Sequence, residues 1–308
     1  MEPAQALEPS LDRLSALLER FRVRAHWLHA GPLCGVTHFD AAQGRGFVHV
    51  LRRGAMTLEH PARSGAPRRL QVDEPTLLFY PRPLAHTFHN PPAEGSDFVC
   101  ATLDFDGGAR HPLARALPPL LVLPLRAVDG LEQTLALLFA EAERVRCGQR
   151  LLADRLFDVL VLQLLRWLLD HPAEAKLPPG MLTGLSDPKL ARTLTAIHEQ
   201  PGADWSLAAM AETAGMSRSA FAAAFKQHVG HTPVEYLTQW RVAVAQALLR
   251  QGASLKTASL QLGYRNASSL SRVFTQSVGM SPRAWLRNGG AEKGNEPRLP
   301  QPGAGGGR

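Results

Sequence analysis

One pattern is written twice between Ser206 and Leu286, and this duplication limits what the C-terminal third of the chain can fold into. Three residues recur unchanged 48 positions later: Ser206, Leu207 and Gly215. Five recur 49 positions later, the fourth of them as a tryptophan: Phe225, Gly230, Pro233, Tyr236 and Leu237. The change of offset places one inserted residue between the shared glycine and the shared phenylalanine. Duplication at a fixed offset is typical of a repeated structural unit, and the apolar spacing in each copy indicates helices.

Each copy carries the signals of two short helices joined by a tight turn. In the first copy Ser206 and Ser217 are predicted helix caps, and Gly215 supplies the positive φ of the turn. The corresponding residues of the second copy are Ser254, Asn266 and Gly263. A longer helix from Pro233 to about Gly252 joins the copies. This geometry places the second helix of a unit across the major groove of DNA, and two such helices would enter successive grooves about 34 Å apart.

The net charge of +7 is concentrated in the duplicated region. Residues 1–188 contain 20 Lys and Arg against 21 Asp and Glu, whereas residues 189–288 contain 11 against 4. A basic domain beside a neutral one is typical of a polyanion-binding module joined to a module that does not bind polyanions. An ordinary solvated basic face is the alternative, and the duplication makes it the less favoured one.

The residues before the duplication divide into a β-rich part and a helical part. Short apolar runs between residues 23 and 105, broken by Gly, Pro and Asp, predict an antiparallel β-sandwich or small barrel. The runs are FVHVL (47–51), TLLFY (76–80) and FVCATLDF (98–105). From residue 129 to residue 171 the apolar spacing predicts helices, and the second of these is apolar around most of its girth. Such a helix is buried on more than one side, either within the chain or against a partner chain in a homodimer.

The predicted fold class is therefore α+β, and composition divides the chain into five segments. They are a β-rich domain (1–128), a helical dimerisation segment (129–170), a Pro- and Gly-rich linker (171–187), a double helix-turn-helix domain (188–288) and a disordered tail (289–308).

No apolar run reaches about 18 residues, so we expect no membrane span. The N-terminus lacks the features of a secretory signal, and three widely spaced cysteines argue against a disulfide scaffold. A cytoplasmic protein is expected.

The second copy contains the pattern LGY-x-x-x-S-x-x-SR-x-F-x-x-x-x-G-x-SP-x-x-W. This pattern resembles the signature of the AraC/XylS family of bacterial transcription regulators, and the first copy resembles the first helix-turn-helix of that family. The resemblance covers about Pro188 to Leu286. It implies a seven-helix DNA-binding domain with two helix-turn-helix units, and it implies double-stranded DNA and RNA polymerase as partners.

The resemblance and the helix geometry together give the predicted DNA contacts. In the family, bases are contacted from positions that match Ser219, Ala222 and Ala223 on the first recognition helix and Arg272 on the second. Alanine offers only a methyl group to a thymine methyl, whereas arginine can bind guanine through two hydrogen bonds, so we expect the second helix to discriminate bases more strongly. Expected phosphate contacts, each of which could instead be a solvated surface charge, are Arg218, Lys226, Arg241 and Arg265. The predicted DNA-binding residues are Arg218, Ser219, Ala222, Ala223, Lys226, Asn266, Ser268, Ser269 and Arg272.

The β-rich part resembles the cupin-like sensor domain common in that family. Residues Pro81 to Asn90 match the second cupin motif, with Pro83 where glycine is usual. The first motif is represented by His49, and Leu51 occupies the place of its second histidine. The candidate effector or metal residues are His29, Cys34, His49, His86, His89 and Cys100. Thiolate and imidazole groups together suit zinc or copper, and thiols can respond to oxidants. The alternative is that each is an ordinary core or rim residue.

These features predict a transcription regulator whose N-terminal domain senses a small-molecule, metal or redox effector and whose C-terminal domain binds DNA. An activator that acts as a homodimer is expected, with no catalytic residue and with a transition metal as a candidate cofactor. One alternative is a cupin-type metal-dependent enzyme fused to a DNA-binding domain. Another is an architectural DNA-binding protein without a ligand, but a large sandwich with no sensing or dimerising role argues against it.

Overall fold

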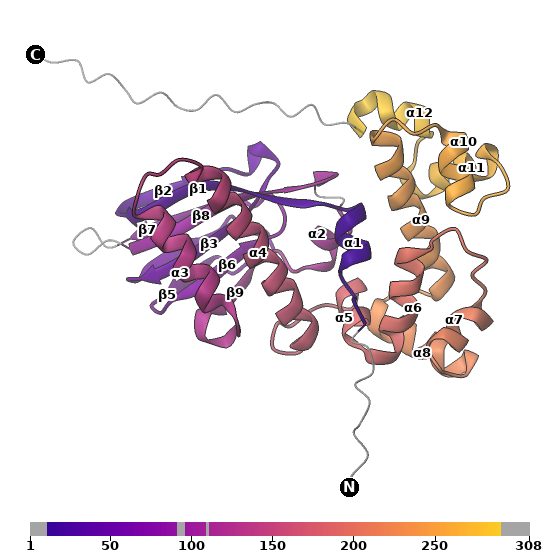
Figure 1. Cartoon of the computed structure of the whole chain (residues 1–308), viewed down its shortest axis with the longest axis horizontal. Helices are drawn as coiled ribbons and strands as arrows, with labels where there is room; N and C mark the ends of the chain where they lie inside the picture. Colours follow the sequence, from indigo (N-terminus) through magenta and orange to yellow (C-terminus); the bar gives the residue numbers. More distant parts are fainter. Residues whose placement is uncertain (1–10, 91–95, 109–110, 291–308) are drawn as a thin grey trace, which may run out of the picture.

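A computed structural model describes residues 11–90, 96–108 and 111–290, and it contains a β-sandwich with attached helices beside an all-helical part (Figure 1). Five strands form one sheet, in the order β1 (Val23–Leu33), β8 (Ser96–Phe105), β3 (Gly46–Arg53), β6 (Thr76–Tyr80) and β9 (Leu121–Pro124). Four strands form the other, in the order β2 (Gly35–Phe39), β7 (His86–Asn90), β4 (Met56–Glu59) and β5 (Arg69–Val72). The strand pairs are antiparallel, which confirms the predicted sandwich.

Alternate residues of the central strand β3 enter two different cores. Leu51 packs with Leu58 and Phe88 of the second sheet, whereas Val48 and Val50 pack with apolar side chains of the helices. The apolar runs predicted to be strands lie in β3, β6 and β8, all of them in the five-stranded sheet. Because that sheet is buried on both faces, these strands carry continuous apolar runs instead of alternating ones.

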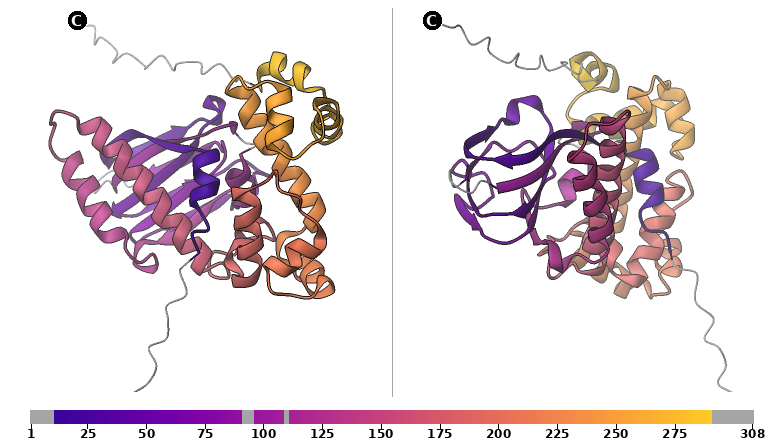
Figure 2. Two further views of the ribbon diagram at one scale, coloured as in Figure 1. Left: turned by 45° about the vertical axis from the view of Figure 1, so that its right-hand side comes forward. Right: turned by 60° about the vertical axis from the view of Figure 1, so that its left-hand side comes forward.

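Two long helices lie across the outer face of the five-stranded sheet (Figure 2): α3 (Leu131–Ala142) and α4 (Gln149–Asp170). Asp158 Oδ1 accepts a hydrogen bond from Ala25 N at 2.9 Å, and Asp154 Oδ1 accepts one from Trp27 N at 2.6 Å. These carboxylates satisfy backbone groups of β1, which as an edge strand would otherwise leave them unpaired. The remaining short elements of this half are α1 (Ser15–Arg20), η1 (Ala41–Gln43), α2 (Pro112–Ala116) and η3 (Leu125–Ala127).

The segment expected to be a linker, residues 171–187, contains a helix, α5 (Met181–Ser186). Leu182 and Leu185 are fully buried, and α5 packs against α4 of the first half and α8 of the second. The connection is therefore not irregular along its whole length, because a short apolar run inside a Pro- and Gly-rich stretch finds a core to enter. Helix α6 (Pro188–Glu199) follows at once, capped by Asp187.

The C-terminal half has the helices that the duplication predicts. After α6 they are α7 (Leu207–Thr213), α8 (Arg218–Val229), α9 (Pro233–Arg250), α10 (Leu255–Gln261), α11 (Ala267–Val278), α12 (Pro282–Trp285) and η4 (Leu286–Gly290). The four predicted caps are formed by their side chains: Ser206, Ser217, Ser254 and Asn266. Thr232 caps α9 in the same way. Gly215 and Gly263 adopt φ angles of 64° and 73° in the two turns. Helices α7 and α8 lie at one end of α9, and α10 and α11 lie at the other (Figure 1). The predicted tail lies outside the described residues from position 291 onward.

The two halves meet around α1. Phe21, directly after α1, is buried between Trp240 of α9 and His111 at the start of α2, with ring centroids 5.1 and 5.7 Å away. Arg20 donates to the carbonyl oxygens of the last two residues of α6 at 3.1 and 2.9 Å. A cation is favoured at such a helix end. Within the described part of the chain, no helix is both long and apolar enough to cross a membrane.

Candidate nucleic-acid interface and sensor sites

The outer face of α8, called here the first reader, presents the predicted residues of the first copy. Arg218, Ser219, Ala223 and Lys226 are exposed, and Ala222 is half-buried. The opposite face packs into the domain through Phe221, Phe225 and Val229. The helix contains no acidic residue, so a small apolar centre flanked by cations faces outward. Such a surface can approach a DNA backbone closely and contact phosphates at its edges.

The outer face of α11, called here the second reader, is more polar. Ser268 and Arg272 are exposed and line a hollow of about 800 Å³ on this face. The other lining residues are Leu255, Ala267, Ser271, Thr275 and Gln276. Sequence reasoning missed Gln276, which lies one helical turn after Arg272; the four-residue spacing from Arg272 is the signal that could have found it. Glutamine can bind adenine through two hydrogen bonds, as arginine binds guanine.

Two predicted contacts of the second reader also form its helix cap. Asn266 Oδ1 accepts a hydrogen bond from Ser269 N at 2.9 Å and another from Ser269 Oγ at 3.0 Å. The cap uses the hydroxyl proton of Ser269 and the amide oxygen of Asn266. The amide nitrogen of Asn266 is not used by the cap, so it can donate outward.

Arg241 is placed differently from the sequence expectation of a phosphate contact. Its Nε donates to the carbonyl oxygen of Pro201 at 2.7 Å, and its Nη2 donates to that of Ala203 at 2.9 Å. The guanidinium carbon also lies 5.5 Å from the ring centroid of Tyr264. The expected phosphate contact is therefore wrong for Arg241, because its donors are engaged inside the domain.

Comparison with known proteins agrees with this architecture. Residues 12–170 match the cupin family model and residues 210–288 match the helix-turn-helix domain model. An AraC-like transcription regulator of Streptomyces antibioticus is 30% identical over 299 residues, which cover 88% of this chain and 97% of that protein. Another, from Streptomyces lividans, is 29% identical over 301 residues with the same coverage. The chain belongs to the AraC family of transcription regulators. The solved DNA-binding domain of AdpA with a target DNA is 27% identical, covering 35% of this chain and 98% of that chain, with a TM-score of 0.33.

The family membership confirms the resemblance seen in the duplicated region, and the protein is a DNA-binding transcription regulator. Both the α+β fold class and the cupin-like N-terminal half are confirmed by the matched families and by the structure. The relatives over the full length are transcription regulators, which supports this function over the cupin-type enzyme.

The interior of the sandwich in this AraC-family regulator brings three of the six candidate sensor residues together. His49 Nδ1 lies 3.0 Å from Cys100 Sγ, and His49 Nε2 lies 3.0 Å from His86 Nε2. All three side chains are buried. His86 also stacks between the rings of Phe39 and Tyr80, at centroid distances of 4.8 and 4.1 Å. The arrangement is a hydrogen-bonded chain enclosed by aromatic rings.

Burial keeps the side chains of His49, His86 and Cys100 uncharged near neutral pH. It holds the pKa of His49 well below its usual value, with the nearby His86 adding to the effect. It also lowers the pKa of His86 to about 4 and raises the pKa of the Cys100 thiol. A protonated, enclosed thiol is a weak nucleophile, because the thiolate is the reactive form.

The residues present do not fit a complete cupin metal site. Cys100 faces Nδ1 of His49, whereas His86 faces Nε2, and these two nitrogens point away from each other. One ion could not be bound by all three side chains in this arrangement. Among the described residues, no group of three or more His, Cys, Asp or Glu is placed to hold a metal ion.

The other three candidates are not hydrogen-bonded to His49, His86 or Cys100 among the described residues. Cys34 is exposed in the turn between β1 and β2. His89 is half-buried on β7, with Nε2 3.2 Å from Glu59 Oε2. His29 is half-buried on the edge strand β1 and is the cross-strand partner of Cys100, but its Nε2 has no hydrogen-bond partner among the described residues. The structure therefore places His29 beside Cys100, whereas Cys34 and His89 lie away from His49.

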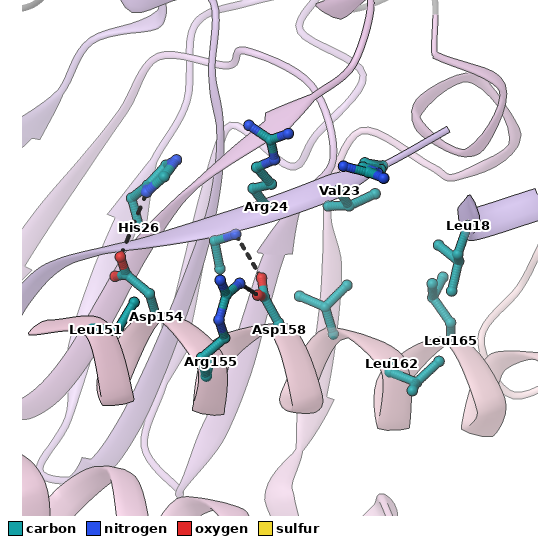
Figure 3. Close-up of a pocket in the computed structure, with 13 residues that line it drawn as sticks. Leu18, Val23, Arg24, His26, Leu151, Asp154, Arg155, Asp158, Leu162 and Leu165 are labelled. Atoms are coloured by element: carbon teal, nitrogen blue, oxygen red, sulfur yellow. Dashed lines mark hydrogen bonds and ion pairs between the residues drawn. The ribbon is translucent and has the colours of Figure 1, made fainter. Parts of the chain in front are cut away.

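A groove of about 600 Å³ lies between β1 and α4, and sequence reasoning did not identify it (Figure 3). Its apolar lining includes Leu18 of α1, Val23 of β1, and Leu162 and Leu165 of α4. Its polar lining is Arg22, Arg24, His26, Asp154, Arg155 and Asp158. The two walls come from segments more than 120 residues apart, so no local pattern in the sequence could indicate the groove.

Proposed function

We propose that this AraC-family protein is an effector-controlled transcription regulator that binds DNA as a homodimer. The observation that carries the proposal is the packing of Phe21 against Trp240. Through it the sensor half holds α9, the helix that carries a helix-turn-helix unit at each end. The protein could exist in two conformations that differ in the position of α1. A ligand that binds one of them more tightly would therefore change the orientation of both readers.

The two readers are proposed to divide the work of DNA binding. The second reader discriminates bases through Arg272, with Ser268 and the free amide nitrogen of Asn266 beside it. The first reader fits the groove with Ala222 and Ala223, and it adds Ser219 as a polar contact. Phosphate contacts come from Arg218, Lys226 and Arg265, all of which are exposed.

The groove between β1 and α4 is the proposed effector site. Its volume of about 600 Å³ is within the range of sites for small molecules, and its lining of apolar side chains beside arginine and aspartate suits an amphipathic ligand. Leu18 lines the groove, and Arg20 and Phe21 contact the DNA-binding half, so the same short segment joins both. The raised pKa of buried Cys100 argues against that thiol as the direct target of an oxidant.

The N-terminal part of α4 is the proposed dimer contact. Three apolar side chains on it remain exposed, Leu151 at 63%, Leu152 at 48% and Val159 at 45%. Leu28 on the adjacent strand β1 is 49% exposed. Exposed apolar side chains on neighbouring elements are candidates for contact with a partner chain. The proposed dimer acts in the cytoplasm as an activator together with RNA polymerase, and it has no catalytic step.

Selection of bound duplexes from a random DNA library by the full chain tests the function. We expect duplexes with two conserved boxes about one helical turn apart. Mapping of bound sites in the host genome then gives a promoter for a reporter, whose response identifies growth conditions that supply the effector. A chain that selects no sequence would contradict the proposed function.

A groove-filling variant tests the effector site. Leu162→Trp should keep its selected DNA sequences but lose the reporter response, because the indole occupies the groove. The matched control is Leu137→Trp on α3, an exposed leucine outside the groove. A full response from Leu162→Trp would contradict the placement of the effector.

A further inference from the structure

The two helix-turn-helix units touch each other beside α9, where the backbone before the first unit meets the turn of the second. The loop of residues 200–205, which leads from α6 into the first unit, lies against the turn of the second unit. A Cβ atom on Gly202 would overlap the carbonyl oxygen of Gln261, and one on Gly263 would overlap the carbonyl oxygen of Gly202. The two backbones are therefore in direct contact with no side chain between them.

Arg241 of α9 ties this contact together from the side. It donates from Nε to Pro201 O at 2.7 Å and from Nη2 to Ala203 O at 2.9 Å, both in the loop. Its guanidinium lies over the ring of Tyr264, which directly follows the turn glycine of the second unit. The planar, five-donor guanidinium suits this combined role, because it can stack on a ring and bind two acceptors at once.

The loop itself is held at both ends. Arg20 of α1 donates to the carbonyl oxygens of the two residues that precede it, at 3.1 and 2.9 Å. Trp205 Nε1, at the far end of the loop, donates to Gln200 O at 2.9 Å. The loop is thus a fixed point of the first unit, against which Arg241 can hold the second.

The first copy of the duplication shows that the turn alone does not require such packing. Gly215 stands at the place that corresponds to Gly263 and has a similar φ of 64°. A Cβ atom on Gly215 would meet no atom within 4 Å, whereas one on Gly263 would also lie 3.3 Å from Arg241 Nη2. The close approach is therefore a property of the junction between the units.

Helix α9 packs against α10 and α11 of the second unit, but packing against one helix restrains rotation about that helix less than two separate contacts do. Helix α9 ends at Arg250, and Gly252 lies in the connection to α10 with a φ of 89°. A Cβ atom on Gly252 would meet no atom within 4 Å, so the backbone at this connection is not closely packed. The contact of the 200–205 loop with the turn at Gly263 is a second restraint on the position of the second unit. We infer that Arg241 positions the second reader relative to the first and thereby sets the spacing of the two DNA boxes that the regulator accepts.

The test measures tolerance to spacing with a duplex selected by the wild-type chain. Affinity is compared for that duplex, for duplexes with one base pair added or removed between the boxes, and for a duplex with a scrambled second box. One base pair shifts the second box by about 3.4 Å and turns it by about 35°. We expect the wild type to bind the duplexes with altered spacing about tenfold more weakly than the selected duplex, as if one base contact were lost. Arg241→Gln should bind them less than about threefold more weakly than it binds the selected duplex, because its second reader can adjust and keep that contact. The wild type and Arg241→Gln should bind the duplex with the scrambled second box with affinities within about twofold of each other, because the first reader is the same in both proteins.

A second pair of variants keeps the proposal testable if Arg241→Gln does not fold. Gly263→Ala should also lose discrimination between spacings, because its methyl group pushes the loop away. Gly215→Ala carries the same strain of a positive φ without the overlap and should keep it. Wild-type discrimination in Arg241→Gln, or equal discrimination in the two alanine variants, would overturn the proposal. Failure of the wild type to select any sequence would instead contradict DNA binding.

Discussion

Four buried imidazoles predict that acid destabilises this regulator well above the pH at which carboxylates titrate. Burial lowers the pKa of His86 and His111 to about 4 and that of His198 to about 3, and it holds the pKa of His49 well below its usual value. In the unfolded chain each histidine has a pKa near 6.5. Because the unfolded state takes up protons that the folded state refuses, full stability is present above pH 6.5 and is lost as pH falls toward the folded pKa values.

The magnitude follows from proton linkage. At pH 5.5 an unfolded histidine is about nine-tenths protonated, and a folded one with a pKa of 4 or less is almost entirely neutral. The difference between pH 7.5 and pH 5.5 is about 1 kcal/mol of unfolding free energy for each such histidine, and about 3–4 kcal/mol for His86, His111 and His198 together, with His49 adding in the same direction. This is a large part of the stability of many domains, so the urea midpoint should fall steeply over this interval.

Urea unfolding at the two pH values, followed by tryptophan fluorescence and circular dichroism, measures this effect. His198→Gln should reduce the pH dependence of the unfolding free energy by about 1 kcal/mol, since it removes one of the titrating groups. Tyr236→Phe is the control, because it removes the partner 2.6 Å from His198 Nε2 and leaves the imidazole buried. It should cost about 1–3 kcal/mol at both pH values and keep the wild-type pH dependence. An unchanged pH dependence in His198→Gln would refute the reasoning.

Three further outcomes are expected for DNA binding and assembly. Arg272→Ala should weaken binding to a selected duplex by about 1–3 kcal/mol and relax one base position in a repeated selection, whereas an equal loss on all sequences would show a phosphate contact. Lys226→Ala should weaken binding to every duplex and reduce the slope of log affinity against log salt by about 1, and an unchanged slope would exclude a phosphate contact. Leu152→Glu should convert a dimer to a monomer in sedimentation velocity with unchanged circular dichroism, and a wild type that sediments as a monomer would contradict the proposed dimer.

The unequal chemistry of the two readers has a consequence for operators of this regulator. An alanine-centred helix contributes shape fit and methyl contacts, which discriminate weakly, while an arginine beside serine and glutamine can discriminate strongly. We therefore expect the box under the second reader to be the more strictly conserved in selected sequences. Fixed spacing between the boxes would then let the weaker box add affinity only when the stronger one is in register.

Features that depend on local chemistry could be predicted from neighbouring residues. A serine or asparagine cap binds a backbone N–H three residues ahead, and a turn glycine supplies its own positive φ, so both can be identified from neighbouring residues. The duplication multiplied these signals, and every helix it predicts is present, including α9 between its cap Thr232 and Gly252. Likewise the continuous apolar runs were sufficient to predict the central strands, because burial on both faces leaves a pattern within one segment.

Contacts between groups far apart in the sequence became evident in the folded chain. Arg241 is of a residue type that often contacts phosphate, but its partners are carbonyl oxygens 38 and 40 residues away. Every residue has a carbonyl oxygen, so the sequence cannot indicate which ones Arg241 binds. Likewise His49 meets His86 and Cys100 while Cys34 stays exposed, because strand pairing and not residue type decides which side chains face one interior. The groove between β1 and α4 exists for the same reason: its walls become neighbours only when the sheet edge is covered. Contacts between segments far apart in the sequence depend on the packing of the whole chain. The residues that form them therefore cannot be identified from their sequence neighbours.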